Sequence, residues 1–233
     1  MTNMKKNNVT IFIPIRKGSK RIINKNIKKL PNYNYGLTEI KINQLINLNK
    51  ICKNKFNIEI IIGTDCEVVK SYAKKFSLIK IFERNKILSA DHSLQKLINF
   101  LPKICNGEFI LWTHVTSPLF NEHDYLNFLE SFFKSKKIYD SGFSADILGK
   151  FLMNNKQKWV SHNYAKKKWP RTQDLQDLFI CNSAAFISTK KNYLLYKDRL
   201  GKKPIPIISR KYSSLDIDDQ DDFNFLKKIV LAK

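Results

Sequence analysis

The chain has 233 residues, of which 43% are hydrophobic and 12% aromatic, enough to bury a sizeable core and to exclude disorder throughout. Its apolar runs are far shorter than the roughly 20 residues that a membrane-spanning helix needs. A net charge of +22 raises nucleic acid as a partner. The lysines are spread along the whole chain, however, and a small polyanionic substrate suits the same charge, so we do not expect nucleic acid.

The cysteines and the first residues bear on the compartment. The residues ahead of the first strand-like run show no apolar segment of the kind a signal peptide needs. No C-x-x-C pair occurs, so we expect neither a zinc site nor a disulfide framework, and we expect a cytoplasmic protein. The four cysteines are Cys52, Cys66, Cys105 and Cys181.

Strands and helices alternate over the first 134 residues. Val9–Ile15 is a largely apolar run that predicts a buried strand, a turn follows at Gly18, and apolar residues at helical spacing predict a helix over Leu37–Ile51. Asp65 and Asn121 each stand where a side chain can cap the helix that follows. In chain order, we then expect a strand at 58–63, a helix at 67–76, a strand at 78–82, a helix at 93–104, a strand at 109–115 and a helix at 122–134.

The alternation breaks after Ile138, where 143–153 and 159–169 are short, mixed segments that we expect to be irregular. Strands at 184–188 and 205–208 and a helix at 219–230 then complete the prediction. Strands alternating with helices predict one three-layer α/β domain over 1–233 with a largely parallel sheet. In such sheets a ligand lies beyond the carboxyl ends of the strands, which directs attention to the residues after Ile15, Gly63, Phe82 and Val115.

The segment after the first predicted strand is strongly basic. Cationic side chains and backbone N–H groups in such a turn suit phosphate oxygens. Neither G-x-x-x-x-G-K-[ST] nor G-x-G-x-x-G is present, and a solvated basic turn is the alternative in a chain this rich in lysine. The five cations fall within ten residues and are Arg16, Lys17, Lys20, Arg21 and Lys25.

Aspartates concentrate near the C-terminus. Asp216 and Asp218 are two residues apart in a stretch that reads as extended, so both carboxylates are expected on one side. Two carboxylates beside substrate phosphates are a typical Mg²⁺ arrangement. The alternative is that acids merely start the last helix favourably, which explains Asp218 or Asp219 but not Asp216.

A polar turn follows the strand predicted at 109–115. The run Trp112-Thr-His114-Val-Thr116-Ser117-Pro-Leu119 places hydroxyls and an imidazole where they can contact a base or a sugar. A lone histidine is more often a structural side chain. With no second histidine or cysteine at ligand spacing and no G-x-S-x-G, we expect neither zinc nor serine-hydrolase chemistry.

Six segments, in unbroken order from about residue 9 to 230, resemble those of the acylneuraminate cytidylyltransferases and their relatives that act on other 3-deoxy-2-keto sugar acids. The family's A-R-x-x-S-K-x-x-x-x-K-N loop stands here as Ile15-Arg16-Lys-Gly-Ser19-Lys20, then Arg-Ile-Ile-Asn, then Lys25-Asn26. The resemblance implies a three-layer α/β/α nucleotide-diphospho-sugar transferase fold. The other segments are Gly63-Thr64-Asp65, residues 84–93, Leu111–Leu119, Pro170–Gln173 with Asn182–Ile187, and Ser214–Asp222.

The resemblance also implies a reaction, in which CTP and a 2-keto sugar acid give the CMP-sugar and pyrophosphate. Carried over by position, Arg16, Ser19, Lys20 and Lys25 would hold the triphosphate, with Asn26, Arg84 and Asp91 beside the nucleotide. Asp216 and Asp218 would bind Mg²⁺, and with Arg16 and Lys25 they form the implied catalytic set. The implied sugar-binding residues are His114, Thr116, Ser117, Lys150, Arg171 and Asn182.

The irregular stretch 143–171 matches the position where this family extends a dimerisation arm. The resemblance therefore implies a homodimer in which Lys150 and Arg171 reach a sugar acid carboxylate in the partner subunit's site. For Lys150 an ordinary exposed lysine is the alternative.

The departures from the family pattern gather around the sugar pocket. They are His114 for Gln, Val115 for Pro, Phe120 for Arg and Ser183 for Gly. Our hypothesis is that CTP activation persists while the sugar differs from ordinary sialic acid. Two alternatives stay open: a cytidylyltransferase for an octulosonate-type sugar acid, and a basic nucleic-acid-binding module on an inactive transferase fold.

Overall fold

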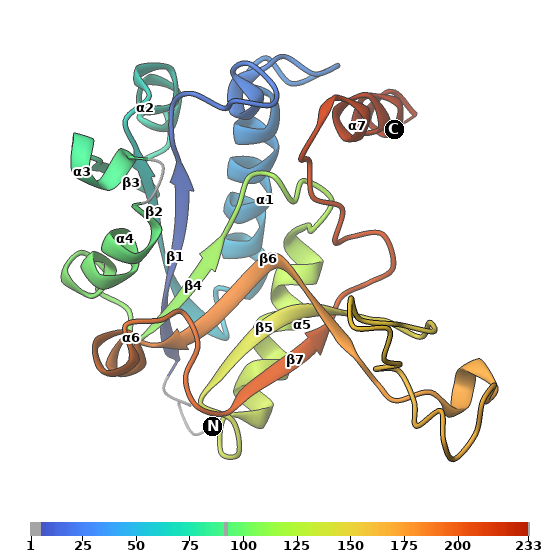
Figure 1. Cartoon of the computed structure of the whole chain (residues 1–233). Coiled ribbons are helices and arrows are strands. Elements are labelled where there is room, and N and C mark those ends of the chain that lie inside the picture. The colour runs from blue at the N-terminus through green and yellow to red at the C-terminus, as the bar shows by residue number, and fades with distance from the viewer. Residues whose placement is uncertain (1–5, 91–92, 233) are drawn as a thin grey trace.

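The computed structural model describes residues 6–90 and 93–232, and a seven-stranded sheet runs through its centre (Figure 1). The strands lie in the order β3-β2-β1-β4-β6-β5-β7. Their bounds are Asn7–Ile15 for β1, Phe56–Thr64 for β2, Ile79–Glu83 for β3, Phe109–Thr113 for β4, Ser141–Ile147 for β5, Phe179–Thr189 for β6 and Pro204–Ile208 for β7.

The sheet is largely parallel, as predicted. β1 pairs in parallel with β2 and β4, β2 with β3, and β5 with β7, whereas β6 runs antiparallel to both β4 and β5. The pairing of β1 with β2 runs without a break from Asn7 opposite Phe56 to Ile15 opposite Thr64. This register brings the loop after β1 and the turn after β2 to the same edge of the sheet.

Helices cover both faces of the sheet, which makes three layers. Helices α1, α2, α5 and α7 pack on one face around a large apolar core, and α4 and α6 pack on the other around a smaller one. The helices are α1 Gly36–Cys52, α2 Glu67–Ala73, α3 Lys86–Ser89, α4 Leu94–Phe100, α5 Glu122–Ser135, α6 Lys190–Tyr196 and α7 Gln220–Leu231, with short 3-10 helices at Lys25–Ile27, Leu101–Lys103 and Thr172–Asp174.

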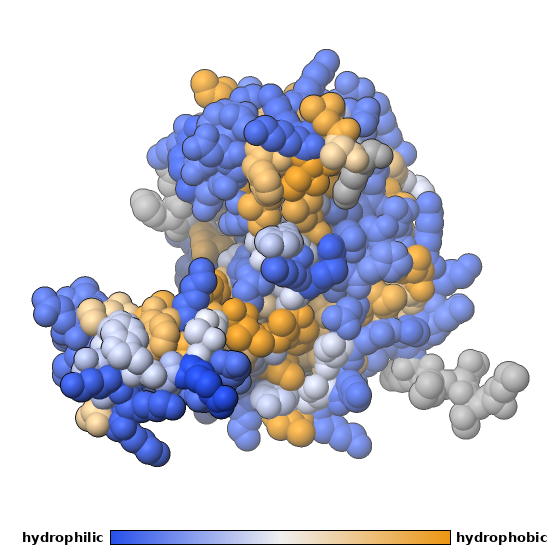
Figure 2. All heavy atoms as spheres, turned by 90° about the vertical axis from the view of Figure 1, so that its right-hand side faces the viewer, coloured by the Kyte–Doolittle hydropathy of each residue, from blue (hydrophilic) through white to orange (hydrophobic). Residues whose placement is uncertain are grey.

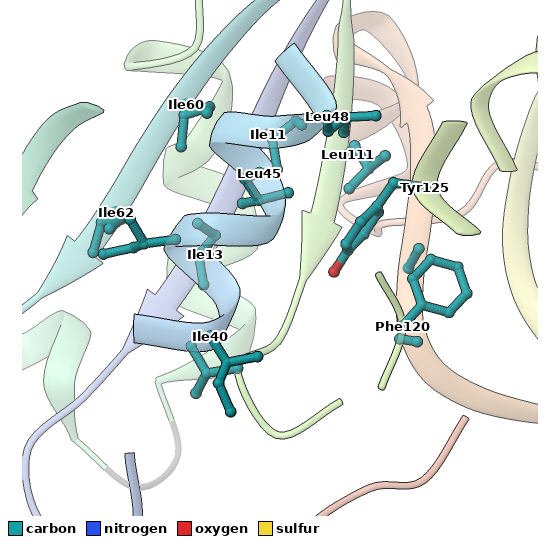
Figure 3. Close-up of a cluster of buried hydrophobic side chains, with 14 of the residues drawn as sticks. Ile11, Ile13, Ile40, Leu45, Leu48, Ile60, Ile62, Leu111, Phe120 and Tyr125 are labelled. Carbon is teal, nitrogen blue, oxygen red and sulfur yellow. The ribbon is translucent and has the colours of Figure 1, made fainter. Parts of the chain in front are cut away.

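The two cores follow from the alternation of side chains along each strand. In β1, Ile11 and Ile13 face the large core, where they meet Leu45 and Leu48 of α1 (Figure 3). Phe12, between them, faces the smaller core on the other side. Because both faces are covered, the strand is apolar from Val9 to Ile15 except at Thr10, as strands of parallel sheets are.

The structure differs from the sequence prediction at 141–147, which is strand β5 between β6 and β7 rather than the start of an irregular segment. The prediction missed it because the run is rich in small residues, with Ile147 as its one β-branched residue. A side chain at Gly142 would approach Ile205, Phe132 and Ile187 within 3.3 to 3.4 Å. Close packing therefore sets the composition of β5. Helices α3 and α6 were also not predicted from the sequence.

An irregular lobe, residues 148–178, projects from the sheet between β5 and β6 (Figure 1). Its two ends meet, because the Leu148 N–H donates to the Leu178 carbonyl at 2.8 Å. Inside it, the rings of Phe151 and Trp169 lie 5.3 Å apart and those of Trp159 and Trp169 lie 5.6 Å apart. The aromatic contacts give the lobe a small apolar centre of its own.

The two helix caps predicted from the sequence have different outcomes. Asn121 caps α5 as predicted, since its side chain accepts hydrogen bonds from the N–H groups of His123 and Asp124. The prediction that Asp65 caps α2 is wrong: its carboxylate accepts the Lys17 N–H at 2.7 Å instead and so holds the loop after β1. Among the residues that the structure describes, no helix is both long and apolar enough to cross a bilayer.

Helix α1 carries a completely buried lysine, Lys41. Its ammonium donates to the carbonyls of Ser117 and Phe120 at 2.9 and 3.1 Å and to the Tyr125 hydroxyl at 2.8 Å. These three bonds fix the turn after β4 between α1 and α5. Burial lowers the pKa of Lys41 to about 7, although nearby Asp124 opposes the shift.

We predict that replacing Lys41 with methionine changes how stability depends on pH. Between about pH 7 and about pH 10 the unfolded chain binds the lysine proton more tightly than the folded chain does, so the wild type gains stability as the pH rises. The free energy of unfolding of Lys41→Met, measured relative to the wild type, should therefore fall by about 1 kcal/mol per pH unit over that range. Urea unfolding of both proteins at several pH values measures it, with Lys50→Met on the same helix controlling for the lost charge. A difference that does not vary with pH would contradict the prediction.

Candidate functional site

A cavity of about 400 Å³ lies where β1 and β4 end. The loop after β1 forms one wall and the turn after β4 forms the other, although the two segments are far apart in the sequence. We call this space the loop cavity. Its lining residues are Pro14, Arg16, Ser19, Lys20, Arg21, Lys25, Asn26, His114, Val115 and Thr116.

The loop at 16–26 is held in place by short polar contacts. Gly18 has φ +83° and Asn24 has φ 55°, both in the left-handed region that glycine and asparagine tolerate best. The Asn26 side-chain amide donates to the Arg16 carbonyl at 3.2 Å, and the Thr38 hydroxyl donates to the Asn26 carbonyl at 2.7 Å. These contacts fold the loop back on itself, so that several of its cations face one cavity.

Lys25 connects the basic loop to the aspartate segment. It is 9% exposed, and its ammonium donates to the Ile217 carbonyl and lies 4.0 Å from the nearer carboxylate oxygen of Asp218. Burial lowers the pKa of Lys25, whereas the negative charges of Asp218 and Asp216 oppose this shift. The structure therefore brings together the two charged segments that the sequence analysis singled out.

Asp216 and Asp218 flank Ile217, whose N–H donates to the Thr116 carbonyl at 2.8 Å. Asp216 accepts a hydrogen bond from the Thr116 side chain, and Asp218 pairs with Arg21 at 2.7 Å. Burial raises the pKa of Asp216, and the neighbouring charge of Asp218 adds to that effect. Arg21, which the sequence analysis counted among the basic residues but gave no role, is thus a partner of this pair.

Helix capping explains only the later aspartates of the segment. Asp219 is the N-cap of α7, and its side chain accepts from the N–H groups of Asp221 and Asp222. Asp222 in turn accepts from the N–H groups of Asp218 and Asp219. The carboxylates of Asp216 and Asp218 take no part in the cap, so the favourable start of a helix does not account for them.

The pair of carboxylates fits a hard divalent cation. One carboxylate oxygen of Asp216 is buried and has no hydrogen-bond partner, and a cation would satisfy it. Across residues 6–90 and 93–232, no group of three or more histidine, cysteine, aspartate or glutamate side chains is placed to hold a metal ion. A cation between Asp216 and Asp218 would therefore take its other ligands from substrate and water.

Arg84 lies beneath this edge of the sheet and does not line the loop cavity. It is 6% exposed, its Nε donates to the Leu88 carbonyl at 2.9 Å, and its Nη2 lies 3.4 Å from the Ser93 hydroxyl. These bonds organise the segment after β3. Asp91, the other residue predicted beside the nucleotide on this segment, lies outside the described residues.

The turn after β4 divides the residues predicted to contact the sugar. His114 and Thr116 line the loop cavity, whereas the Ser117 hydroxyl is buried without a hydrogen-bond partner and the residue faces Lys41. Burial lowers the pKa of His114 to about 3, helped by the positive charges of Arg199 and Lys41. The imidazole is therefore neutral.

Asn182 is oriented by two serines that the sequence did not single out. Its side-chain oxygen accepts from the Ser144 hydroxyl at 2.6 Å, and its nitrogen donates to the Ser209 hydroxyl at 2.9 Å. The pairing of β5 with β6 shifts register here, between Phe143 and Ala145. Asn182 does not line the loop cavity, and isolated serines carry no sequence signal that could have revealed this network.

The two cations predicted on the lobe also lie outside the loop cavity. Lys150 is exposed, and Arg171 is exposed and makes a two-point ion pair with Asp174, with both N–O distances 3.1 Å. Within one chain, neither residue contributes to the cavity wall.

Comparison with known proteins agrees with these features. A family model described as cytidylyltransferase matches residues 10–230. The N-acylneuraminate cytidylyltransferase of Streptococcus agalactiae serotype III is 30% identical over 187 residues, which cover 71% of this chain and 41% of that protein. The proteins with the same description from serotypes Ia and V match equally well. The chain thus spans about two fifths of the length of these curated relatives.

Two solved structures share the architecture. A CMP:2-keto-3-deoxy-manno-octonic acid synthetase complexed with CTP matches with TM-score 0.62 and 12% identity, over 97% of this chain and 99% of that one. A 4-diphosphocytidyl-2C-methyl-D-erythritol synthase from Anaerococcus prevotii matches with TM-score 0.64 and 13% identity, with the same coverage. At these identities the likeness concerns the fold alone. It confirms the predicted nucleotide-diphospho-sugar transferase fold.

Ser183 generates a prediction because its φ of 62° lies in the left-handed region, where a side chain is strained. We expect Ser183→Gly to raise the free energy of unfolding by up to about 1 kcal/mol. Ala184→Gly is the matched control, because Ala184 has no positive φ and its replacement should lower stability by about 1 kcal/mol. Chemical denaturation of the three proteins measures the difference. Equal losses in both variants would show that Ser183 carries no strain.

Proposed function

Because the chain belongs to the cytidylyltransferase family, we propose that it activates a sialic acid-like 3-deoxy-2-keto sugar acid with CTP, giving the CMP-sugar and pyrophosphate. One observation carries this proposal: Lys25 joins the basic wall of the loop cavity to the segment of Asp216 and Asp218. A triphosphate and the cation that accompanies it need these two kinds of charge side by side.

In the proposed reaction the anomeric hydroxyl of the sugar acid attacks the α-phosphorus of CTP in line. A bond forms between that oxygen and the phosphorus, the bond from the phosphorus to the oxygen that bridges to the β-phosphate breaks, and the hydroxyl proton passes to solvent water. Arg16, Lys20 and Lys25 would bind triphosphate oxygens, with the Ser19 hydroxyl and Asn26 beside them. Their charges stabilise the leaving pyrophosphate most strongly in the transition state.

Asp216 and Asp218 would hold Mg²⁺, which supplies charge stabilisation at the α-phosphate and at the leaving group. The chain prepares this place by keeping an Asp216 oxygen buried and unpartnered. Thr116 orients the same carboxylate, while Arg21 and Lys25 limit the repulsion between the two aspartates. Arg84 would act on the nucleotide indirectly, by holding the Leu88 carbonyl and the Ser93 hydroxyl after β3.

The sugar acid would lie beside the turn after β4, where His114 and Thr116 face the loop cavity. The relatives described as N-acylneuraminate cytidylyltransferases support a nonulosonate. The fold likeness to an octonic acid synthetase supports an octulosonate as the second candidate. The arrangement of the site residues disfavours an inactive nucleic-acid-binding module, because such a module would not need a buried Asp216 carboxylate oxygen that has no hydrogen-bond partner.

The lobe is proposed to cross to a second copy of the chain, so that Lys150 and Arg171 approach the sugar carboxylate in the partner's site. Apolar side chains on its surface support this: Trp169 is 64% exposed and Met153 is 49% exposed. Figure 2 shows apolar side chains gathered on the face that carries the lobe. A homodimer in the cytoplasm agrees with the four free thiols. Light scattering tests the dimer, and a monomeric mass would contradict it.

The proposal predicts that the enzyme, in the presence of Mg²⁺, releases pyrophosphate from CTP with one member of a panel of sialic, legionaminic, pseudaminic and octulosonic acids. Release with a nonulosonate supports the proposal, and release with the octulosonic acid alone favours the second candidate. Efficient turnover of N-acetylneuraminate would refute the hypothesis of a different sugar. Silence across the panel, together with no thermal stabilisation by CTP, would overturn the transferase reading.

The second prediction concerns Asp216→Asn, which should lower turnover at least 100-fold, by roughly the effect of removing one preorganised electrostatic group. Because burial raises the pKa of Asp216, its carboxylate opposes folding at neutral pH, so the variant should melt at a higher temperature. This gain should fade as the pH falls and the wild-type carboxyl takes up its proton. Exposed Asp221→Asn, in the same segment, is the control and should retain turnover. Near-normal activity of Asp216→Asn would show that Asp216 is not part of the catalytic site.

A further inference from the structure

The turn after β4 fixes the hydrogen-bonding state of His114. The indole Nε1 of Trp112, two residues earlier, lies 2.9 Å from the Nε2 of His114. An indole nitrogen can only donate, so Nε2 must offer its lone pair. A neutral imidazole with an accepting Nε2 carries its proton on Nδ1. The Nδ1–H is then the polar group of His114 for which the described residues provide no hydrogen-bond partner, and it is a donor.

The surroundings keep Trp112 in the position from which it donates. Trp112 is 1% exposed, its ring centre lies 5.2 Å from that of Phe12, and the Arg199 guanidinium carbon lies 5.2 Å from it on the smaller core. The same guanidinium carbon lies 4.0 Å from the ring centre of Phe186. The indole is therefore held by an aromatic ring and by a cation.

The charges facing the imidazole are those of Arg199 and Lys41, and both disfavour a second proton on it. Tyr125 accepts a hydrogen bond from Lys41 and is uncharged, since burial raises the pKa of Tyr125 well above its usual range. Thr113, which is hydrogen-bonded to the Tyr125 hydroxyl, has no ionisable group. The carboxylates of Asp124 and Glu122 act on Lys41, and the Lys41 ammonium bonds to neutral acceptors. The electrostatics and the Trp112 bond thus favour the same neutral ring.

We infer that His114 contacts the sugar acid only as a hydrogen-bond donor. Trp112 and Arg199 are its positioning residues. The inference rests on the proposed function and narrows it. A glutamine at this place would offer both an N–H and a carbonyl oxygen, whereas this ring cannot accept. The matching group on the substrate is an oxygen that accepts, either the carbonyl of an acylamino group or a carboxylate. A substrate N–H placed there would face the ring's N–H and be rejected.

The state of the ring is tested without substrate, by nitrogen NMR of the histidine side chains in the whole enzyme. We expect His114 to show the Nδ1–H tautomer and to stay neutral from about pH 5 to about pH 8, the range in which an ordinary imidazole titrates. In Trp112→Phe the hydrogen bond from the indole is absent, so the imidazole of His114 should exchange between its two neutral tautomers. An Nε2–H tautomer, or titration within that range in the wild type, would overturn the inference even if the enzyme is a cytidylyltransferase.

The role of the ring is tested by kinetics. Trp112→Phe should raise KM for the sugar acid about 3-fold to 10-fold, the effect of one neutral hydrogen bond, and leave KM for CTP unchanged. An equal rise in both values would indicate general damage and overturn the positioning role. An unchanged KM for the sugar acid would overturn the contact while leaving the cytidylyltransferase in place.

Two sugar acids separate the sources of the accepting oxygen. If the partner is an acyl carbonyl, the effect of Trp112→Phe should vanish with octulosonic acid, which has the carboxylate and no acylamino group. If the partner is the carboxylate, the effect should persist with both. Absence of turnover with any sugar acid, together with no thermal stabilisation by CTP, would overturn the proposed function and, with it, the sugar contact. The NMR result on the ring would still stand by itself.

Discussion

The ammonium of Lys25 is the contact on which the rest of the site depends. Lys25 begins a short 3-10 helix that follows Asn24, a residue in the left-handed conformation, and its ammonium donates to the Ile217 carbonyl. Ile217 is completely buried and also donates to Thr116, so a single residue joins the loop after β1, the turn after β4 and the segment before α7. Apart from the short 3-10 helix at Lys25–Ile27, these segments are irregular, and Lys25 and Ile217 hold them next to one another.

The site gathers interactions that disfavour folding. Burial lowers the pKa of Lys25 and Lys41 and raises the pKa of Asp216. The charged form of each of these groups is therefore less favourable in the folded protein than in water. Such groups are typical of functional sites, where the surrounding structure keeps them in place. In the proposed complex, a triphosphate and its cation would offset the burial of Lys25 and Asp216 by bringing opposite charges to both groups.

Much of the fold could be predicted from the sequence. The alternation of apolar runs predicted the parallel sheet, and Asn121 predicted the start of α5 correctly because its cap needs only neighbouring residues. Asp65 failed as a cap because a distant N–H, that of Lys17, takes its carboxylate. Strand β5 was missed because its small residues are required by close neighbours across the sheet and carry no local preference for a strand.

For the site, the sequence predicted which segments meet but not how. Parallel strands place their carboxyl ends at one edge, so the grouping of Arg16, Lys25 and His114 follows from topology and the resemblance. The pairing of Arg21 with Asp218 and the donation from Trp112 to His114 depend on side-chain positions that no spacing encodes. The position of Lys150 and Arg171 relative to a sugar depends on a second chain and stays a prediction.

The closed neck of the lobe has an evolutionary consequence. Leu148 and Leu178 are hydrogen-bonded to each other, so the chain leaves the sheet and re-enters it at nearly the same point. A short hairpin could join β5 to β6 there without altering the register of any strand. The lobe could therefore lengthen, shrink or be exchanged while the strand pairing of the sheet is preserved. A relative with the same sheet could differ in these roughly thirty residues and keep the rest of the fold.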